Sequence, residues 1–319
     1  MRRPPVRFLV GLAGMTDLKI EALRTPDDRF VHLPGYGYAP HYVDGLPGYG
    51  SLRVHYVDQA PAGAPTGRTV LCLHGQPTWS YLYRKMIPVF SAAGHRVVAP
   101  DLLGFGRSDK PVDDAVYTFL FHRGMLLRFV EALDLQRVTL VVQDWGGLLG
   151  LTLPMEFPGR IDRLVVMNTG LGIGRSPGPG FDAWKAFVAA QPDFDIAQLM
   201  RRSVPGLTDA EAAAYAAPFP DERYRAGVRR FPALVPVSPD MEGVAESLRA
   251  AEFFRERWTG QTFMAIGMQD PVLGPPVMQA LAGVIRGCPP PMEVAQAGHF
   301  VQEHGREVAE AALRAFGDA

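Results

Sequence analysis

The residue best placed to do chemistry is Asp144, between an apolar run at 138–143 and the glycine pair at 146–147. A strand-to-helix turn of this kind holds its corner side chain above the edge of a sheet, where hydrolases commonly place a nucleophile. A carboxylate, with an unperturbed pKa of about 3.9, is ionised at neutral pH. It can therefore attack saturated carbon without a base and form an ester that water later opens. The alternative is that Asp144 only caps the following helix, and the turn alone does not separate the two roles.

Two further polar residues follow apolar runs in the same way. Asp270 comes after the run 262–266, and His299 comes after the run 292–295 and a glycine. In open α/β sheets, ligands bind outside the carboxyl ends of the strands. Asp144, Asp270 and His299 also stand in the chain order nucleophile, acid, histidine that is found in hydrolases. We therefore expect Asp270 to orient His299 and His299 to act as a general base.

Each of these assignments has a competitor. Asp270 could simply form a turn, because Asp-Pro is a turn dipeptide. Asn168 occupies the other place from which the acid could come, but an amide cannot supply a charge. Among the other histidines, we expect His74 to shape the turn that follows it. His122 and His304 lie in helical sequence, and we expect them to face solvent or to cap.

Short apolar runs alternate with helix-length segments along most of the chain. The runs are 52–57, 69–73, 96–100, 138–143, 163–167, 262–266 and 292–295, and helices are predicted at 117–133 and 301–316. Several runs are apolar at consecutive positions, which is typical of parallel strands covered on both faces. The alternation predicts an α/β fold with a mostly parallel, doubly wound sheet.

Residues 170–240 interrupt this alternation. They begin with a glycine- and proline-rich stretch and continue as alanine-rich helical sequence without a strand-like run. We therefore predict a helical cap, or lid, at 170–240, inserted into a core formed by 20–169 and 241–319. Residues 1–19 are predicted to be an N-terminal extension rather than a signal peptide, because no small-residue cleavage site follows their apolar run.

Composition narrows the function classes. A net charge of −1 over 319 residues gives no electrostatic reason to expect nucleic acid or an anionic membrane as partner. No segment reaches the roughly 18 apolar residues of a membrane span. Two cysteines, Cys72 and Cys288, make a disulfide framework improbable and favour a reducing, cytoplasmic compartment. We see no metal-ligand cluster or nucleotide-binding loop, so we expect no metal and no cofactor, and we expect a monomer.

Four segments together resemble one family, the haloalkane dehalogenases of the α/β-hydrolase superfamily. They are His-Gly-Gln-Pro-Thr-Trp-Ser-Tyr-Leu-Tyr-Arg at 74–84, Gln-Asp-Trp-Gly-Gly at 143–147, Phe-Met-Ala-Ile-Gly-Met at 263–268 and Ala-Gly-His-Phe-Val-Gln-Glu at 297–303. The resemblance extends from about Ile20 onward and is closest to the subfamily whose type member degrades 1,2-dichloroethane. It implies hydrolysis of haloalkanes to a primary alcohol and halide, through an alkyl ester on Asp144 that water activated by His299 opens.

The resemblance also implies binding groups. The backbone N–H groups of Gln76 and Trp145 would form the oxyanion hole, and the indoles of Trp145 and Trp184 would bind the halide. Lid packing is the alternative role for Trp184, and Trp79 and Trp258 are expected to be structural. The closest subfamily has glutamate where this chain has Gln76, whereas other dehalogenases have asparagine there and use its side-chain amide to bind the halide. We therefore hypothesise that the Gln76 side chain is a further halide donor. The implied pocket wall is Leu148, Phe181, Phe231, Pro232, Val235, Val272 and Leu273. Such a wall suits short uncharged haloalkanes and offers nothing to bind a carboxylate.

Two other functions remain open. An epoxide hydrolase would use the same aspartate but needs acidic donors for the epoxide oxygen, usually two lid tyrosines, and the lid contains Tyr215 and Tyr224. A noncatalytic ligand-binding protein with this fold would be expected to lack at least one of Asp144, Asp270 and His299. All three are present.

Overall fold

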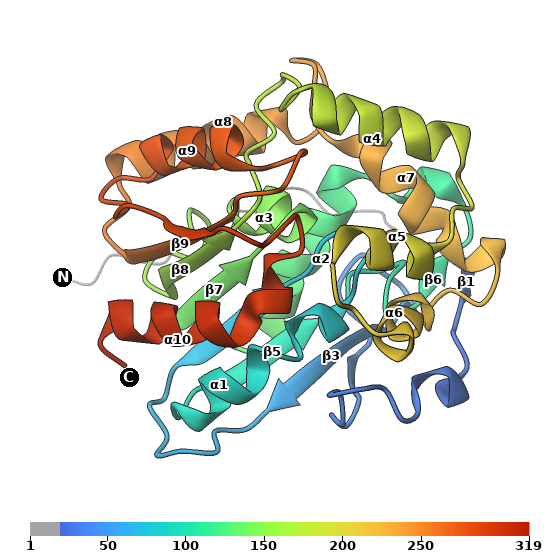
Figure 1. Ribbon diagram of the computed structural model, residues 1–319, viewed down its shortest axis with the longest axis horizontal. Coiled ribbons are helices and arrows are strands. Elements are labelled where there is room, and N and C mark those ends of the chain that lie inside the picture. The colour runs from blue at the N-terminus through green and yellow to red at the C-terminus, as the bar shows by residue number, and fades with distance from the viewer. Residues whose placement is uncertain (1–19, 319) are drawn as a thin grey trace.

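The computed structural model describes residues 20–318, and the predicted extension at 1–19 lies outside them. Within 20–318, eight strands form the central sheet (Figure 1). They are β2 (His41–Val43), β3 (Val54–Gln59), β4 (Thr69–Leu73), β5 (Arg96–Pro100), β7 (Val138–Val142), β8 (Ile161–Met167), β9 (Gln261–Gly267) and β10 (Met292–Val294). Their order is β10-β9-β8-β7-β4-β5-β3-β2.

The sheet is mostly parallel, as predicted. Neighbours from β10 to β5 pair in parallel, whereas β3 and β2 pair antiparallel at one edge. Every residue of β4 and β7 is buried, which explains their consecutive apolar residues. The short edge strand β2 was not predicted, because three partly exposed residues carry no hydrophobic pattern. A separate small sheet joins β1 (Ala22–Leu23) to β6 (Lys110–Pro111).

Helices cover both faces of the sheet. They are α1 (Ile87–Ala92), α2 (Phe119–Ala132), α3 (Trp145–Gly150), α8 (Val244–Glu256), α9 (Pro275–Val284) and α10 (Gly305–Phe316). Figure 1 shows α1 and α10 together on one face and α8 and α9 together on the other. The 3-10 turns are η1 (Asp27–Phe30), η2 (Ser80–Tyr83), η3 (Asp114–Val116), η4 (Glu222–Arg225) and η5 (Val301–His304). Helices α2 and α10 with η5 confirm the two helices predicted from the sequence.

The segment between β8 and α8 is helical, as its composition predicted. It contains α4 (Pro179–Ala190), α5 (Ile196–Ser203), α6 (Asp209–Ala216) and α7 (Ala226–Leu234). In Figure 1 these helices group at one end of the sheet, and they are the elements of the proposed lid at 170–240. Among the described residues, no helix combines the length and the apolar character needed to cross a membrane.

Candidate active site

Asp144 stands at a strained turn between β7 and α3. Its φ of 50° and ψ of −125° lie in a region that residues other than glycine rarely adopt. The turn also needs glycine nearby, because a Cβ on Gly75 would come within 2.1 Å of Asp144 Oδ1. Although Asp144 occupies the N-cap position of α3, its side chain makes no capping hydrogen bond. Its Oδ1 instead accepts the backbone N–H of Gln76 at 2.8 Å. These contacts remove the capping alternative.

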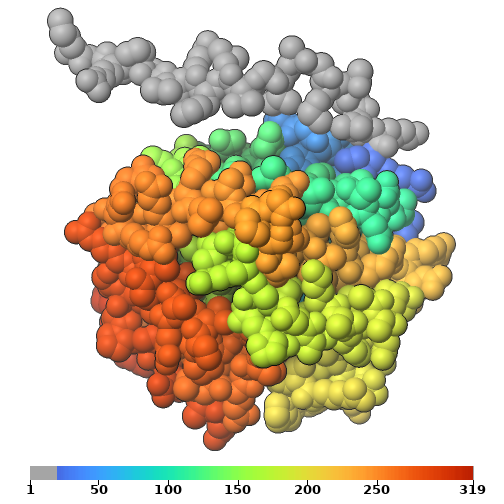
Figure 2. Space-filling view, turned by 90° about the horizontal axis from the view of Figure 1, so that it is seen from above, coloured from blue at the N-terminus to red at the C-terminus, as the bar shows by residue number. Residues whose placement is uncertain are grey.

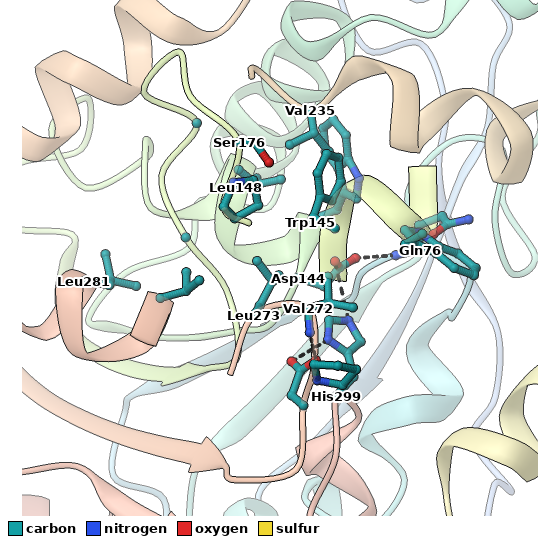
Figure 3. A pocket seen from close by; sticks show the side chains of 18 of the residues that line it. Gln76, Asp144, Trp145, Leu148, Ser176, Val235, Val272, Leu273, Leu281 and His299 are labelled. Carbon is teal, nitrogen blue, oxygen red and sulfur yellow. Dashed lines mark hydrogen bonds and ion pairs between the residues drawn. The ribbon is translucent and has the colours of Figure 1, made fainter. Parts of the chain in front are cut away.

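The fold brings Asp144, Asp270 and His299 together at the carboxyl ends of β7, β9 and β10. His299 Nδ1 lies 2.8 Å from Asp270 Oδ2, and His299 Nε2 lies 3.5 Å from Asp144 Oδ2 (Figure 3). The imidazole therefore bridges two carboxylates that are far apart in the sequence. Such a row of nucleophile, base and orienting acid is suited to nucleophilic catalysis.

Asp270 is held as a carboxylate by its surroundings. Burial alone would raise its pKa, but His299, together with hydrogen bonds from Asn168 and Val272, outweighs burial and lowers the pKa to about 2. Asn168 contributes by donating from Nδ2 to Asp270 Oδ2 at 2.8 Å, and the backbone N–H of Val272 donates to Oδ1. Asn168 thus supports the acid rather than replacing it, and Asp270 is no mere turn residue.

The protonation of His299 depends on burial and on its two carboxylate neighbours. Burial lowers its pKa, yet Asp270 and Asp144 together raise it to about 10. The two carboxylates therefore favour the imidazolium form of this ring. A reaction that neutralises Asp144 removes one cause of this shift, so the pKa of His299 falls. The ring can then lose a proton to solvent and act as a base toward water.

Two backbone N–H groups are available beside the nucleophile. That of Gln76 already contacts Asp144 Oδ1, and that of Trp145, in the first turn of α3, has no acceptor within its own helix. The Gln76 side chain points away from Asp144 in Figure 3 and donates to the carbonyl of Val228 at 2.8 Å. This geometry gives no support to the hypothesis that the Gln76 side chain is a halide donor.

The four tryptophans fall into two groups by their indole N–H. Trp79 donates to the carbonyl of Ala214 and Trp258 to Thr262 Oγ1, both at 3.1 Å, as expected of structural residues. Within residues 20–318, the indoles of Trp145 and Trp184 have no protein acceptor, and both residues line one cavity. Trp184 also packs in the lid, with its ring against two phenylalanines, Phe187 and Phe194. Trp184 therefore packs in the lid and also keeps an indole N–H that no protein acceptor among the described residues occupies.

This cavity has a volume of about 810 Å³ and reaches Asp144, Asp270 and His299. Figure 2 shows a hollow in the surface beside the segment that follows β8. Six of the seven expected wall residues line the cavity: Leu148, Phe181, Pro232, Val235, Val272 and Leu273.

The seventh expected wall residue, Phe231, does not line the cavity. It is fully buried, with its ring centroid 4.5 Å from that of Trp145. Consecutive side chains on a helix point in different directions, so α7 turns Pro232 toward the cavity and Phe231 into the core. Phe231 therefore packs against the indole of Trp145 from the core.

Three arginines, missed at the sequence level, also line the cavity. Arg175, Arg202 and Arg255 come from the loop before α4, from α5 and from α8, and all three are exposed. The expectation that the wall offers nothing to a carboxylate was therefore wrong. No local motif marks these residues, because only the packing of the lid against the core brings them to one opening.

Two other histidines have structural surroundings. His74 Nε2 accepts the backbone N–H of Leu102 at 2.9 Å, which agrees with the expected role in shaping a turn. His122 was expected at the surface but is fully buried beside Tyr117 and Phe231, and burial lowers its pKa to about 3. In the part of the chain that the structure describes, no cluster of three His, Cys, Asp or Glu side chains is arranged to hold a metal ion.

Comparison with known proteins gives a consistent family. A family model of the alpha/beta hydrolase fold matches residues 68–305. The chain is 44% identical over 298 residues to a haloalkane dehalogenase of Psychrobacter cryohalolentis, covering 91% of this chain and 96% of the relative. It is 46% identical to haloalkane dehalogenase 1 of Mycobacterium tuberculosis, covering 92% and 98%.

A solved structure agrees with these relatives. Haloalkane dehalogenase DpaA from Paraglaciecola agarilytica, described as tetrameric, superposes with a TM-score of 0.89. The two chains share 52% sequence identity, with coverage of 92% of this chain and 98% of that one.

Proposed function

Since the chain belongs to the haloalkane dehalogenases of the α/β-hydrolase fold, we propose that it hydrolyses its substrates through a covalent ester on Asp144. Asp144 Oδ2 attacks the carbon that bears the halogen. A carbon–oxygen bond forms as the carbon–halogen bond breaks, and halide leaves with the bonding pair. The Gln76 N–H on Oδ1 supports this assignment, since it orients the carboxylate and marks Oδ2 as the attacking oxygen.

The departing halide needs hydrogen-bond donors, because an unsolvated anion in an apolar cavity is costly. An indole N–H is a donor with no competing acceptor. Trp145 and Trp184 are proposed for this role because both line the cavity and keep their N–H free of protein acceptors within 20–318.

Hydrolysis of the ester is assigned to His299. Its Nε2 takes a proton from water, and the resulting hydroxide attacks the carbonyl carbon of Asp144. Negative charge collects on Oδ1, where the N–H groups of Gln76 and Trp145 stabilise it, and loss of one such donor typically costs about 10²–10³ in rate. The intermediate then releases the alkoxide, which takes its proton from the His299 imidazolium and leaves as the alcohol. Asp144 is left as a carboxylic acid, and loss of its proton to solvent by way of His299 restores the carboxylate.

The observation that carries this proposal is the His299 ring placed between two carboxylates, one of them on a strained, uncapped turn. His299→Ala should release one halide per active site from 1-bromobutane and then stall as the ester. In ¹⁸O water, one turnover of the parent should place heavy oxygen in the peptide that contains Asp144. Steady turnover by His299→Ala, or an unlabelled Asp144, would contradict the mechanism.

Epoxide hydrolysis has less support. Neither Tyr215 nor Tyr224 lines the cavity, and the Tyr215 hydroxyl is buried against Glu303. Hence neither lid tyrosine is positioned to protonate an epoxide oxygen beside Asp144. Release of bromide from 1-bromobutane without formation of a diol from styrene oxide separates the two activities.

The cavity favours substrates larger than 1,2-dichloroethane. Its volume of about 810 Å³ is near the upper end of the roughly 300–1,000 Å³ typical of drug-sized ligand pockets. A two-carbon substrate would leave most of the apolar wall uncovered. The catalytic efficiency kcat/KM measured over a series of 1-bromoalkanes should therefore rise beyond two carbons, and a maximum at two carbons would contradict this.

The expected monomer is at variance with the tetramer described for DpaA. Because the two chains match over nearly their whole length, we carry that assembly to this protein as a proposal. Light scattering coupled to size-exclusion chromatography gives the number of chains per particle, and a particle of one chain would restore the original expectation.

A further inference from the structure

Gln143, the residue before the nucleophile, contacts the base directly. Its side chain is fully buried. Its Nε2 lies 2.9 Å from the ring Nε2 of His299 and 3.1 Å from the main-chain oxygen of the same residue. One amide group therefore holds both the ring and the backbone of His299.

The main-chain contact fixes which way the amide faces. A carbonyl oxygen can only accept, so the NH₂ group of Gln143, not its oxygen, must point at His299. Its Oε1 is then left buried without a partner among the described residues, an arrangement that costs stability. Gln302 shares the same burial and the same unpartnered oxygen, but its Nε2 faces the hydroxyl of Tyr83 instead of His299. The contact with the base distinguishes Gln143.

An N–H donated to His299 Nε2 requires a lone pair on that nitrogen. The ring proton must then sit on Nδ1, where it is donated to Asp270. Two charged groups face the ring, Asp144 and Asp270, and both favour the imidazolium. The uncharged ring of Phe300 packs edge-on to the His299 ring. Gln143 is the group that favours the neutral form.

We propose that Gln143 is a positioning residue that keeps His299 turned and neutral for hydrolysis of the Asp144 ester. This inference rests on the proposed function. Once the ester has neutralised Asp144, only Asp270 still favours the imidazolium, and Gln143 then shifts the ring to its neutral form. Water that displaces the amide from Nε2 meets a base that is already deprotonated and correctly oriented.

The test compares Gln143→Leu and Gln143→Glu with the matched control Gln302→Leu. Both Gln143 variants should keep a full burst of halide, because the ester forms before the step in which His299 acts as a base. Steady-state kcat should fall, and the acid limb of its pH profile should move up by about one pH unit, the worth of one hydrogen bond, with a larger shift for glutamate. Gln302→Leu should leave this limb in place. An unmoved limb in both Gln143 variants, or a shift of equal size in the control, would overturn the proposal.

A second measurement avoids dependence on the folding of these variants. Asp144→Asn removes the nucleophile's charge, as the ester does, while Gln143 stays intact. The ¹⁵N resonances of His299 in this variant should show a neutral ring protonated on Nδ1 at neutral pH, and an imidazolium there would overturn the inference. Labelling of Asp144 in ¹⁸O water distinguishes failure of the proposed function from failure of the role of Gln143. Absence of label would contradict the proposed function, whereas label with an unmoved acid limb would contradict only the role of Gln143.

Discussion

Replacing Trp184 by phenylalanine should weaken halide binding while leaving the lid packed. The change removes the indole N–H but keeps an aromatic ring against Phe187 and Phe194. Trp145→Phe removes the other proposed donor. Trp258→Phe is the matched control, because its N–H serves Thr262 outside the cavity.

The expected loss of halide affinity follows from how far each indole is buried. A hydrogen bond to a charged group contributes about 1.5–3 kcal/mol, which corresponds to roughly 10- to 150-fold in a dissociation constant. Trp145 is only 2% exposed, so its loss should fall within this range. Trp184 is half-buried, and water can replace part of its donor, so a loss of about tenfold is expected.

Bromide affinity should be measured by calorimetry and by product inhibition of 1-bromobutane hydrolysis, since fluorescence changes when a tryptophan is removed. Trp258→Phe should keep the parent's bromide affinity. If Trp184→Phe binds bromide as tightly as this control, Trp184 is a packing residue and the second donor lies elsewhere.

Three other outcomes are expected. Asp270→Asn should retain the halide burst but slow ester hydrolysis by about 10²–10⁴, because His299 loses the carboxylate that orients it. Rapid-quench kinetics measures both steps. Ester hydrolysis at the parent's rate would contradict the orienting role of Asp270. The pKa of His299 is raised from 6.5 to about 10, so the stability gained from its protonation is complete below pH 6.5 and is lost as pH rises toward 10. The melting temperature should therefore fall over this window more steeply in the parent than in His299→Ala, and parallel curves would refute the linkage. Gly75→Ala should abolish halide release, because its Cβ would come within 2.1 Å of Asp144 Oδ1. Gly283→Ala, whose Cβ would meet nothing within 4 Å, should release halide at the parent's rate. An active Gly75→Ala would show that the turn tolerates a side chain.

Much of the fold was predictable because its signals are local. Consecutive apolar residues mark strands covered on both faces, and each predicted run overlaps a strand of the sheet. A parallel sheet brings the residues after its strands to one edge, which is why Asp144, Asp270 and His299 could be grouped from their positions alone. The edge strand β2 has neither length nor periodicity and escaped prediction.

The sequence by itself determined most strands of the sheet, its chemically active edge and the three residues gathered there, since each depends on a pattern within a few positions of the chain. Only the tertiary structure decided what those residues touch. It showed that Asp144 accepts from Gln76 instead of capping a helix, that Phe231 turns into the core, and that exposed arginines reach the cavity. Contacts of this kind join elements far apart in the sequence, and the direction of a side chain depends on how those elements pack.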